Sequence, residues 1–321
     1  MSKPTLKEIL LVFAKLGMIA FGGPAAHVAM MEDEIVRRRR WLSREEFLDL
    51  FGATNLIPGP NSTELAIHIG YRIGSWPGLF AAGIAFISPA FLIVWALAWF
   101  YVEFGTLPAI QSVFIGIKPV IIAVIGQAIW NLSRSAIKDR FLAFLAVLGL
   151  GFYLFWGQEI LVLLLVALFN LLVRKKFRSC NKGLFQLILL TTLCLYPLVK
   201  VWAQVSDKTK IPTENIFGYF AKVGSVLFGS GYVLIAFLQN DLVEKYHWLT
   251  QQQLIDAITI GQFTPGPVFT TATFIGYLIS GNTGAVMATL GIFAPAFLFV
   301  ALSSPFISAL RRARWTSLLL D

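Results

Sequence analysis

Apolar runs long enough to cross a lipid bilayer place the strongest limit on how this chain can fold. They cover residues 76–101, 107–130, 141–156 with the neighbouring run 160–173, and 184–202. A spanning helix needs roughly 20 mainly apolar residues and satisfies its own backbone hydrogen bonds. Only 13% of the residues are charged, whereas a soluble domain carries roughly a quarter. The sequence therefore predicts an all-α integral membrane protein.

Composition and missing motifs argue against several other classes. The net charge of +9 comes from short basic blocks between apolar runs, so we expect no nucleic-acid partner. Cys180 and Cys194 are too few for a disulfide framework or a cysteine metal site. The polar residues 1–8 do not resemble a signal peptide. Because no nucleophile–base arrangement, phosphate-binding loop or cofactor fingerprint is present, we expect neither an enzyme nor a cofactor nor ATP-driven transport.

Four segments in the first part of the chain are too short to cross a bilayer alone. They are residues 7–20, 25–36, 45–57 and 61–71. The sequence Phe-Gly-Gly-Pro at 21–24 separates the first two, and Pro58, Gly59 and Pro60 separate the second two. Proline removes a backbone donor and obstructs the preceding turn, so neither break can be continuous helix. We expect two helical hairpins whose tips point into the membrane, because protein or a polar cavity must satisfy such breaks.

The chain then repeats itself 207 positions later. The segment 13–17, which contains Lys15, returns at 220–224 with Lys222. In the same register the proline triplet returns as Pro265, Gly266 and Pro267. After the loss of one residue, 89–91 matches 295–297. Chance similarity between apolar helices does not easily produce a shared triplet and lysine in one register, so we infer a duplication.

The charge pattern predicts that the two repeats insert in opposite orientations. The basic block 37–40 corresponds to the weakly charged segment 244–247. Conversely, the region after Tyr101 has no base nearby, whereas its counterpart carries arginines at 311, 312 and 314. Basic loops stay on the cytoplasmic side, so the basic side swaps between the repeats. Secondary transporters use such inverted repeats to place a substrate site at the bilayer midplane.

These features divide the chain into three predicted parts. An N-terminal repeat covers residues 1–182, a linking transmembrane helix covers 183–205, and an inverted C-terminal repeat covers 206–321. The first repeat continues from 107 to 173 with three more helices, which the second repeat does not match. By this comparison roughly seventy residues are absent, so we expect a truncated second repeat that lacks its C-terminal helices.

Several motifs taken together resemble the signature of the chromate ion transporter family, in its long two-domain form. They are FGGPAAH at 21–27, RRRRW at 37–41, PGPNST at 58–63, GYR at 70–72, WPG at 76–78 and SPAF at 88–91. The resemblance covers nearly the whole chain. It implies export of chromate, a tetrahedral dianion, across the cytoplasmic membrane, and hence chromate resistance.

Lys15 and Lys222 are the first candidate substrate-binding residues. They occupy equivalent positions in apolar segments, where a lysine is costly and is a functional candidate by default. The alternative is that they snorkel, since Lys15 lies only about two helical turns from Lys7. Their recurrence in both repeats favours a role in binding.

Hydroxyl and amide side chains follow both triplets at predicted helix starts. They are Asn61, Ser62 and Thr63 in the first repeat and Thr270 and Thr271 in the second. A helix N-terminus offers free N–H groups and a favourable dipole to an anion, although ordinary capping would select the same residues. Glycines beside the breaks would let the backbone approach an oxyanion, namely Gly22, Gly23 and Gly229.

Glu64 and His68 share one face of the helix that follows the first triplet, because they are four residues apart. No second cluster completes a metal shell, so we expect no metal site. Both side chains can titrate inside a membrane protein, which suggests proton coupling. Structural hydrogen bonding is the alternative, since the second repeat has Thr271 and Ile275 at these positions.

The sequence thus favours a secondary-active, multi-pass oxyanion exporter of the cytoplasmic (inner) membrane. We expect its partners to be chromate or a sulfate-like oxyanion, the lipid bilayer and a second copy of the chain in a homodimer. Two alternatives stay open: the cargo is sulfate or another anion, or the chain is a non-transporting sensor or assembly module. The equivalent lysines argue against a passive module, which would gain nothing from them.

Overall fold

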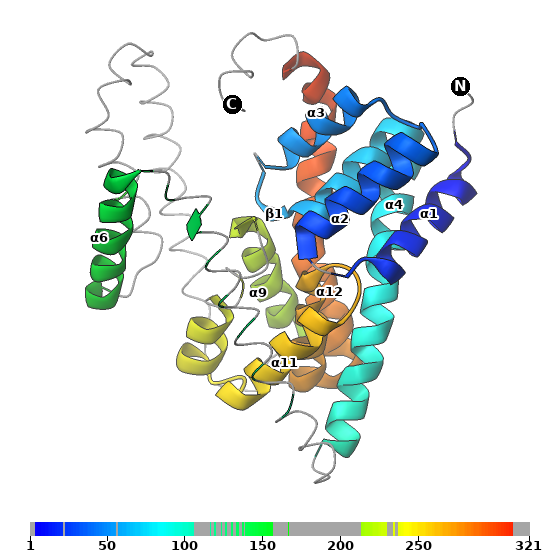
Figure 1. Cartoon of the computed structure of the whole chain (residues 1–321). Helices are drawn as coiled ribbons and strands as arrows, with labels where there is room; N and C mark the ends of the chain where they lie inside the picture. The colour runs from blue at the N-terminus through cyan, green and yellow to red at the C-terminus, as the bar shows by residue number, and fades with distance from the viewer. Residues whose placement is uncertain are drawn as a thin grey trace. The chain divides into compact units, whose positions relative to one another are not determined.

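Figure 1 shows the computed structural model of the chain. The structure describes residues 4–21, 23–55, 57–105, 139–156, 213–229 and 237–310, together with isolated positions between them. Within these residues the fold is all-α, as the sequence predicts, apart from one pair of two-residue strands. The expected spans at 107–130, 160–173 and 184–202 and the arginines at 311–314 lie outside the continuously described residues.

The chain divides into two compact units. The first comprises Met1–Ile122 with Ile211–Asp321, and the second comprises Ala123–Lys210. Within the second unit, helix α6 (Arg140–Trp156) forms where an apolar run predicts a helix. All further elements belong to the first unit.

The first predicted hairpin consists of two helices separated by a break. Helix α1 (Leu6–Ile19) starts with a capping box in which the Thr5 N–H donates to the Glu8 carboxylate at 2.7 Å. Helix α2 (Gly23–Met31) follows the break and continues as the π-helical segment η1 (Glu32–Arg38). The buried face of α1 packs on helix α4 (Asn61–Phe104), where the Gly17 backbone lies directly against the Phe86 carbonyl group.

The second predicted hairpin contains helix α3 (Arg44–Thr54), strand β1 (Gly59–Pro60) and the start of α4. The proline triplet is non-helical, as expected from the missing backbone donors. Helix α4 is 44 residues long, but its backbone leaves the helical region at Gly74 and Ser75. The predicted separation between residues 61–71 and 76–101 is therefore a kink within one long helix.

The elements after residue 211 repeat this order. They are α9 (Thr213–Val226), strand β2 (Phe228–Gly229), π-helical η3 (Gln239–Lys245), α11 (Gln251–Phe263), the 3₁₀ turn η4 (Val268–Thr270) and α12 (Thr271–Leu310). Backbone details recur in the register of the sequence repeat. Arg40 and His247 both have φ of 54°, and the kink of α4 recurs in α12 at Ser280 and Gly281.

Helices α4 and α12 pack side by side and run antiparallel (Figure 1). The Phe80 ring stacks on Phe297 with ring centroids 5.9 Å apart. Farther along α4, Trp95 Nε1 donates to Asn282 Oδ1 at 2.9 Å. Residues later in α4 therefore contact residues earlier in α12, as expected for antiparallel helices. The stretches Asn61–Phe104 and Val268–Ser304 are both long and apolar enough to cross a membrane.

Candidate functional site

Each proline triplet is hydrogen-bonded to the Phe-Gly break of the other sequence repeat. Strand β1 pairs in parallel with β2, so that Gly59 lies opposite Phe228, and the Gly59 N–H donates to the Leu227 carbonyl at 2.6 Å. The equivalent bond runs from the Gly266 N–H to the Ala20 carbonyl at 2.9 Å. These two bonds satisfy broken backbone with protein donors and acceptors, as a membrane interior requires.

Both triplets need glycine at the centre for two separate reasons. Gly59 has φ of +139° and Gly266 has φ of +91°, a region that side chains disfavour. A Cβ on Gly59 would collide with the Glu64 carboxyl group. A Cβ on Gly266 would lie 2.8 Å from Ala90 Cβ and 3.0 Å from the Gly17 carbonyl oxygen.

The start of α4 is buried and has no side-chain cap. Helices α1, α3 and α11 all begin with complete capping boxes, whereas the N-cap residue of α4, Pro60, provides no capping hydrogen bond. Ser62, Thr63 and Glu64 in the first turn are only 3%, 0% and 0% exposed. The first N–H groups of a helix lack partners within the helix, so a buried start requires another acceptor. An anion is the ligand that these N–H groups and the helix dipole favour.

Polar side chains around this start are also unsatisfied. Thr63 Oγ1 and both carboxyl oxygens of Glu64 have no hydrogen-bond partner within the described residues. One turn later, His68 Nδ1 contacts Ser304 Oγ of α12 at 3.0 Å, and its Nε2 atom is buried without a partner. Glu64 and His68 are thus buried on one helix face, and no group of three metal-binding side chains occurs among the described residues.

His27 is part of this site, although the sequence assigned it no role beyond the resemblance motif. Its Nε2 lies 3.1 Å from the Ala20 carbonyl oxygen, and its Nδ1 lies 3.1 Å from Ser62 Oγ. Because a carbonyl only accepts, we assign the hydrogen to Nε2, so the neutral ring accepts the Ser62 hydroxyl hydrogen at Nδ1. His27 therefore links Ser62 at the start of α4 to the Ala20 carbonyl, which also accepts the Gly266 N–H. The position equivalent to His27 in the second repeat is Leu234. This difference between the repeats is the sequence signal that could have pointed to His27.

At the helix start after the second triplet, the threonine hydroxyls bond to carbonyl groups of their own turn. Thr270 Oγ1 donates to the Pro267 carbonyl at 2.8 Å, and Thr271 Oγ1 donates to the Val268 carbonyl at 2.8 Å. Both threonines lie at the helix start, as predicted, but their hydroxyl hydrogens are used within the turn η4. The two helix starts thus both follow a proline triplet and differ in the hydroxyl donors that are available.

The predicted lysines lie on the first helix of each repeat. Lys15 Nζ is 3.6 Å from Glu34 Oε2, and Arg39 Nε donates to Glu34 Oε1 at 2.7 Å. Although burial opposes ionisation, the Arg39 hydrogen bond and the Lys15 charge hold the pKa of Glu34 below its usual value. Lys222 is half-buried in α9, and Asp241 stands at the position equivalent to Glu34.

The remaining predicted site residues lie beside the breaks. Asn61 Nδ2 donates to Asn55 Oδ1 at 2.8 Å. Gly23 begins α2 with φ of +79°, and Gly229 belongs to β2. Gly22 lies outside the described residues.

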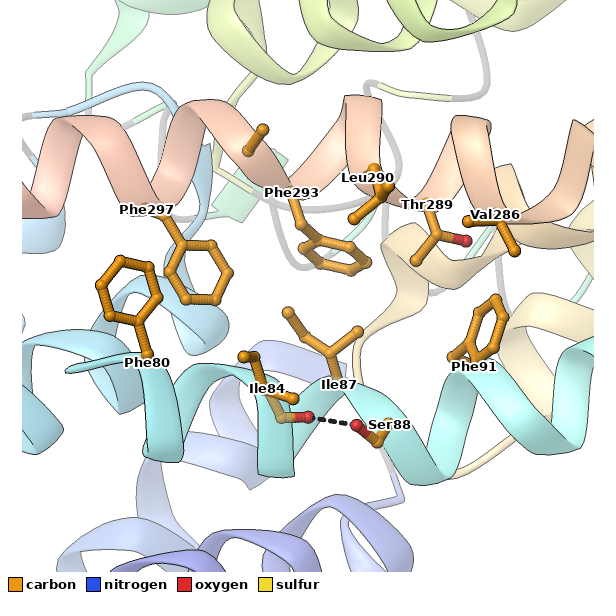
Figure 2. A pocket seen from close by; sticks show the side chains of 11 residues that line it. Phe80, Ile84, Ile87, Ser88, Phe91, Val286, Thr289, Leu290, Phe293 and Phe297 are labelled. Atoms are coloured by element: carbon orange, nitrogen blue, oxygen red, sulfur yellow. Dashed lines mark hydrogen bonds between the residues drawn. The ribbon is translucent and has the colours of Figure 1, made fainter. Parts of the chain in front are cut away.

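A separate groove of about 510 Å³ lies between α4 and α12 (Figure 2). Its walls are mainly aromatic and aliphatic, with Phe80 and Phe297 at one end and Phe91 and Val286 at the other. The Ser88 hydroxyl donates to the carbonyl of Ile84 at 2.6 Å, and Thr289 donates to that of Ala285 at 2.7 Å. With these hydroxyl hydrogens engaged, the groove does not suit a dianion, which needs donors when it leaves water.

Comparison with known proteins identifies the family. The sequence profile described as "Chromate transporter" matches residues 7–172 and 215–321. The chain belongs to the chromate transporter family. The chromate transport protein of Cupriavidus metallidurans is 34% identical over 94% of this chain and 75% of its own length. The probable chromate transport protein of Synechococcus elongatus is 32% identical over 94% of this chain and 76% of its own length.

A third relative, the chromate transport protein of Pseudomonas aeruginosa, is 33% identical over 89% of this chain and 70% of its own length. No solved structure matches the chain. Membership of the chromate transporter family confirms the resemblance and makes the chain a membrane transport protein. The relatives are named as transporters, which points away from an enzyme.

Proposed function

We propose that this chromate transporter family member exports chromate across the cytoplasmic membrane as a secondary-active, multi-pass transporter and thereby confers chromate resistance. The observation that carries the proposal is the buried, uncapped start of α4, which β2 of the other repeat holds in place. Relatives named as chromate transport proteins support chromate as the cargo.

The start of α4 has the chemistry that a tetrahedral oxyanion requires. A dianion that leaves water loses a large hydration energy, which donors must offset. The first-turn N–H groups supply those donors, and Thr63 adds a hydroxyl without a partner among the described residues. Asn61 and Ser62 would join the site by exchanging their bonds to Asn55 and His27 for the anion. Across the interface, Thr270 and Thr271 mark the equivalent start, and the tip glycines allow close approach of the backbone.

Lys15 and Lys222 supply the countercharge in this proposal. Lys15 is ion-paired with Glu34 in the present structure, so an arriving anion would compete with that carboxylate for the ammonium group. Asp241 stands in the same register relative to Lys222. One lysine from each repeat would leave a loaded site that is roughly neutral.

We further propose that the two repeats are inserted in opposite orientations, with the site at the bilayer midplane. The antiparallel packing of α4 and α12 supports this arrangement. Cysteine accessibility labelling in intact cells tests it: a cysteine at Arg38 should be protected from outside reagents, and one at Tyr246 should react. Equal labelling of both positions from outside would contradict inversion. The predicted domain limits at residues 182 and 205 depend on the same topology.

Radiolabelled chromate flux in vesicles of known orientation tests the function itself. We expect the protein to accelerate chromate movement from its cytoplasmic face, and excess sulfate to compete to the extent that the site recognises any tetrahedral dianion. Full flux of sulfate with none of chromate would reassign the cargo. Specific chromate binding without flux would favour a sensor.

A further inference from the structure

Glu64 lies inside the proposed anion site and has no hydrogen-bond partner or cation in the part of the chain that the structure describes. It is in the first turn region of α4, and its carboxyl group folds back against Gly59 at the tip of the triplet. The side chain is fully buried, and both oxygens lack a hydrogen-bond partner within the described residues. A carboxyl group in this place lies beside the helix start that would hold an oxyanion.

On the first two helices packed against α4, Lys7 is exposed, Glu8 caps its own helix, and the other titratable groups are engaged elsewhere. On α1, Lys15 is ion-paired with Glu34. On α2, His27 bonds to the Ala20 carbonyl and the Ser62 hydroxyl. Neither helix therefore supplies Glu64 with a cation in the interactions that the structure shows.

The other neighbours of α4 are engaged or uncharged as well. On α3, Glu46 accepts from Arg72 at 2.5 Å, and Glu45 and Asp49 have interactions of their own. On α11, Asp256 accepts from Tyr101 at 2.9 Å. The described parts of η4 and α12 contain no acidic or basic residue. On α4 itself, His68 is the nearest titratable side chain along the helix, and its Nδ1 is bonded to Ser304.

We propose that Glu64 is protonated whenever an oxyanion occupies the start of α4, an inference that rests on the proposed function. A Glu64 that has ionised at alkaline pH then takes up a proton when the anion binds. An ionised Glu64 and a dianion at the same helix start would repel each other across a short, poorly screened distance. The protonated carboxyl group removes this repulsion and gains an O–H donor for an anion oxygen. By linkage, anion binding favours the protonated form as much as protonation favours the anion.

The proton site belongs to the first repeat alone. Thr271 stands at the position equivalent to Glu64 and donates its hydroxyl hydrogen within the turn. One proton per chain therefore accompanies one dianion, and the anion and proton together carry one negative charge less than the free anion. The remaining net negative charge still moves outward under an inside-negative membrane potential, which is compatible with export.

Proton uptake on chromate binding tests this inference directly. The purified full chain is titrated with chromate in weakly buffered detergent solution containing a pH indicator, at alkaline pH where chromate stays a dianion. Across a series of alkaline pH values, we expect uptake to rise toward about one proton per bound anion as Glu64 ionises in the free protein. Over the same range binding should weaken by up to about tenfold per unit rise in pH. Glu64→Gln, which is neutral and of the same size, should bind chromate without proton uptake and without this pH dependence.

Two further variants assign the proton. Glu103→Gln, at the exposed far end of the same helix, should behave as wild type, and His68→Gln should keep the uptake. Chromate binding to wild type with neither proton uptake nor pH-dependent affinity at any alkaline pH would overturn the inference even if Glu64→Gln does not fold. Uptake that survives in Glu64→Gln and is lost in His68→Gln would overturn it in favour of the histidine. A wild-type protein that binds no chromate would overturn the proposed function, and this inference with it.

Discussion

The starts of α4 and α12 both follow a proline triplet but differ in their polar contents. Each follows a proline triplet whose glycine N–H bonds to the break of the other repeat. Around the start of α4 lie the buried polar residues His27, Ser62, Thr63 and Glu64, whereas the start of α12 uses its threonine hydroxyls within its own turn. The bonds that the two repeats share hold the proline triplets in place, whereas Thr63 and Glu64 of the first repeat have no partner among the described residues and are available for a ligand.

The largest loss of stability should come from changing the central glycine of either proline triplet, which both repeats have. We expect Gly59→Ala and Gly266→Ala each to lower the free energy of unfolding by about 3 kcal/mol or more, since backbone strain adds to steric collision. Thermal unfolding in detergent measures both. Gly281→Ala is the matched control, because it has φ of +61° with no atom within 4 Å of the added Cβ; it should cost only about 1 kcal/mol. Equal losses for all three variants would contradict the role of the tips.

Lys15 and Lys222, one in each repeat, are the proposed countercharges for chromate. Lys15→Ala or Lys222→Ala should weaken chromate binding by about 1–3 kcal/mol, as expected for losing a charge-assisted hydrogen bond. Arginine should rescue only partly, because its planar fork does not replace an ammonium group. Chromate-dependent thermal stabilisation and vesicle flux measure this, with the exposed Lys7→Ala as control. Normal transport by both alanine variants would show that the lysines only snorkel.

His27 is where the first repeat departs most from the second. We expect His27→Leu, which copies the residue at 234, to lower the free energy of unfolding by about 2 kcal/mol, because it removes two buried hydrogen bonds. It should also release Ser62 from its fixed orientation and so alter chromate affinity. Denaturation and binding are measured on the same preparations. A variant as stable as wild type would mean that the His27 contacts are dispensable.

Two threonines should respond in opposite ways. Thr63→Val removes a buried hydroxyl without a partner, so it should leave stability unchanged or raised and weaken chromate binding by about 1 kcal/mol. Thr270→Val breaks the bond to the Pro267 carbonyl, so it should cost about 1 kcal/mol of stability and leave affinity unchanged. Unfolding curves with and without chromate separate the two outcomes. The reverse pattern would place the anion at the second repeat.

The smallest effect concerns the kinks. Ser75 has φ of 52° where the equivalent residue, Gly281, has φ of 61°. Ser75→Gly should therefore stabilise the protein by about 1 kcal/mol, and Gly281→Ser should destabilise it by a similar amount. The melting temperatures of these two variants, compared with that of the wild type, test this prediction. A destabilised Ser75→Gly would show that the serine side chain has a stabilising role of its own.

Much of the fold follows from local sequence signals. The proline triplets predict breaks because proline cannot donate, and Ser43 with Glu46 forms the capping box that starts α3. The site was only partly predictable. Glu64 and His68 were recognised because ionisable residues in apolar helices are rare. The pairing of Gly59 with the break at Leu227 was not, since contacts between distant segments leave no local pattern, and the role of His27 depends on that pairing.

The position of bound chromate tests the central claim most directly. Chromium scatters anomalously, so crystals grown with chromate can locate the anion without reference to the protein atoms. The account predicts a chromium peak at the start of α4, within hydrogen-bonding distance of the N–H groups of Ser62 and Thr63 and beside Gly59. A peak confined to the groove between α4 and α12, or to the arginines at 37–40, would contradict it.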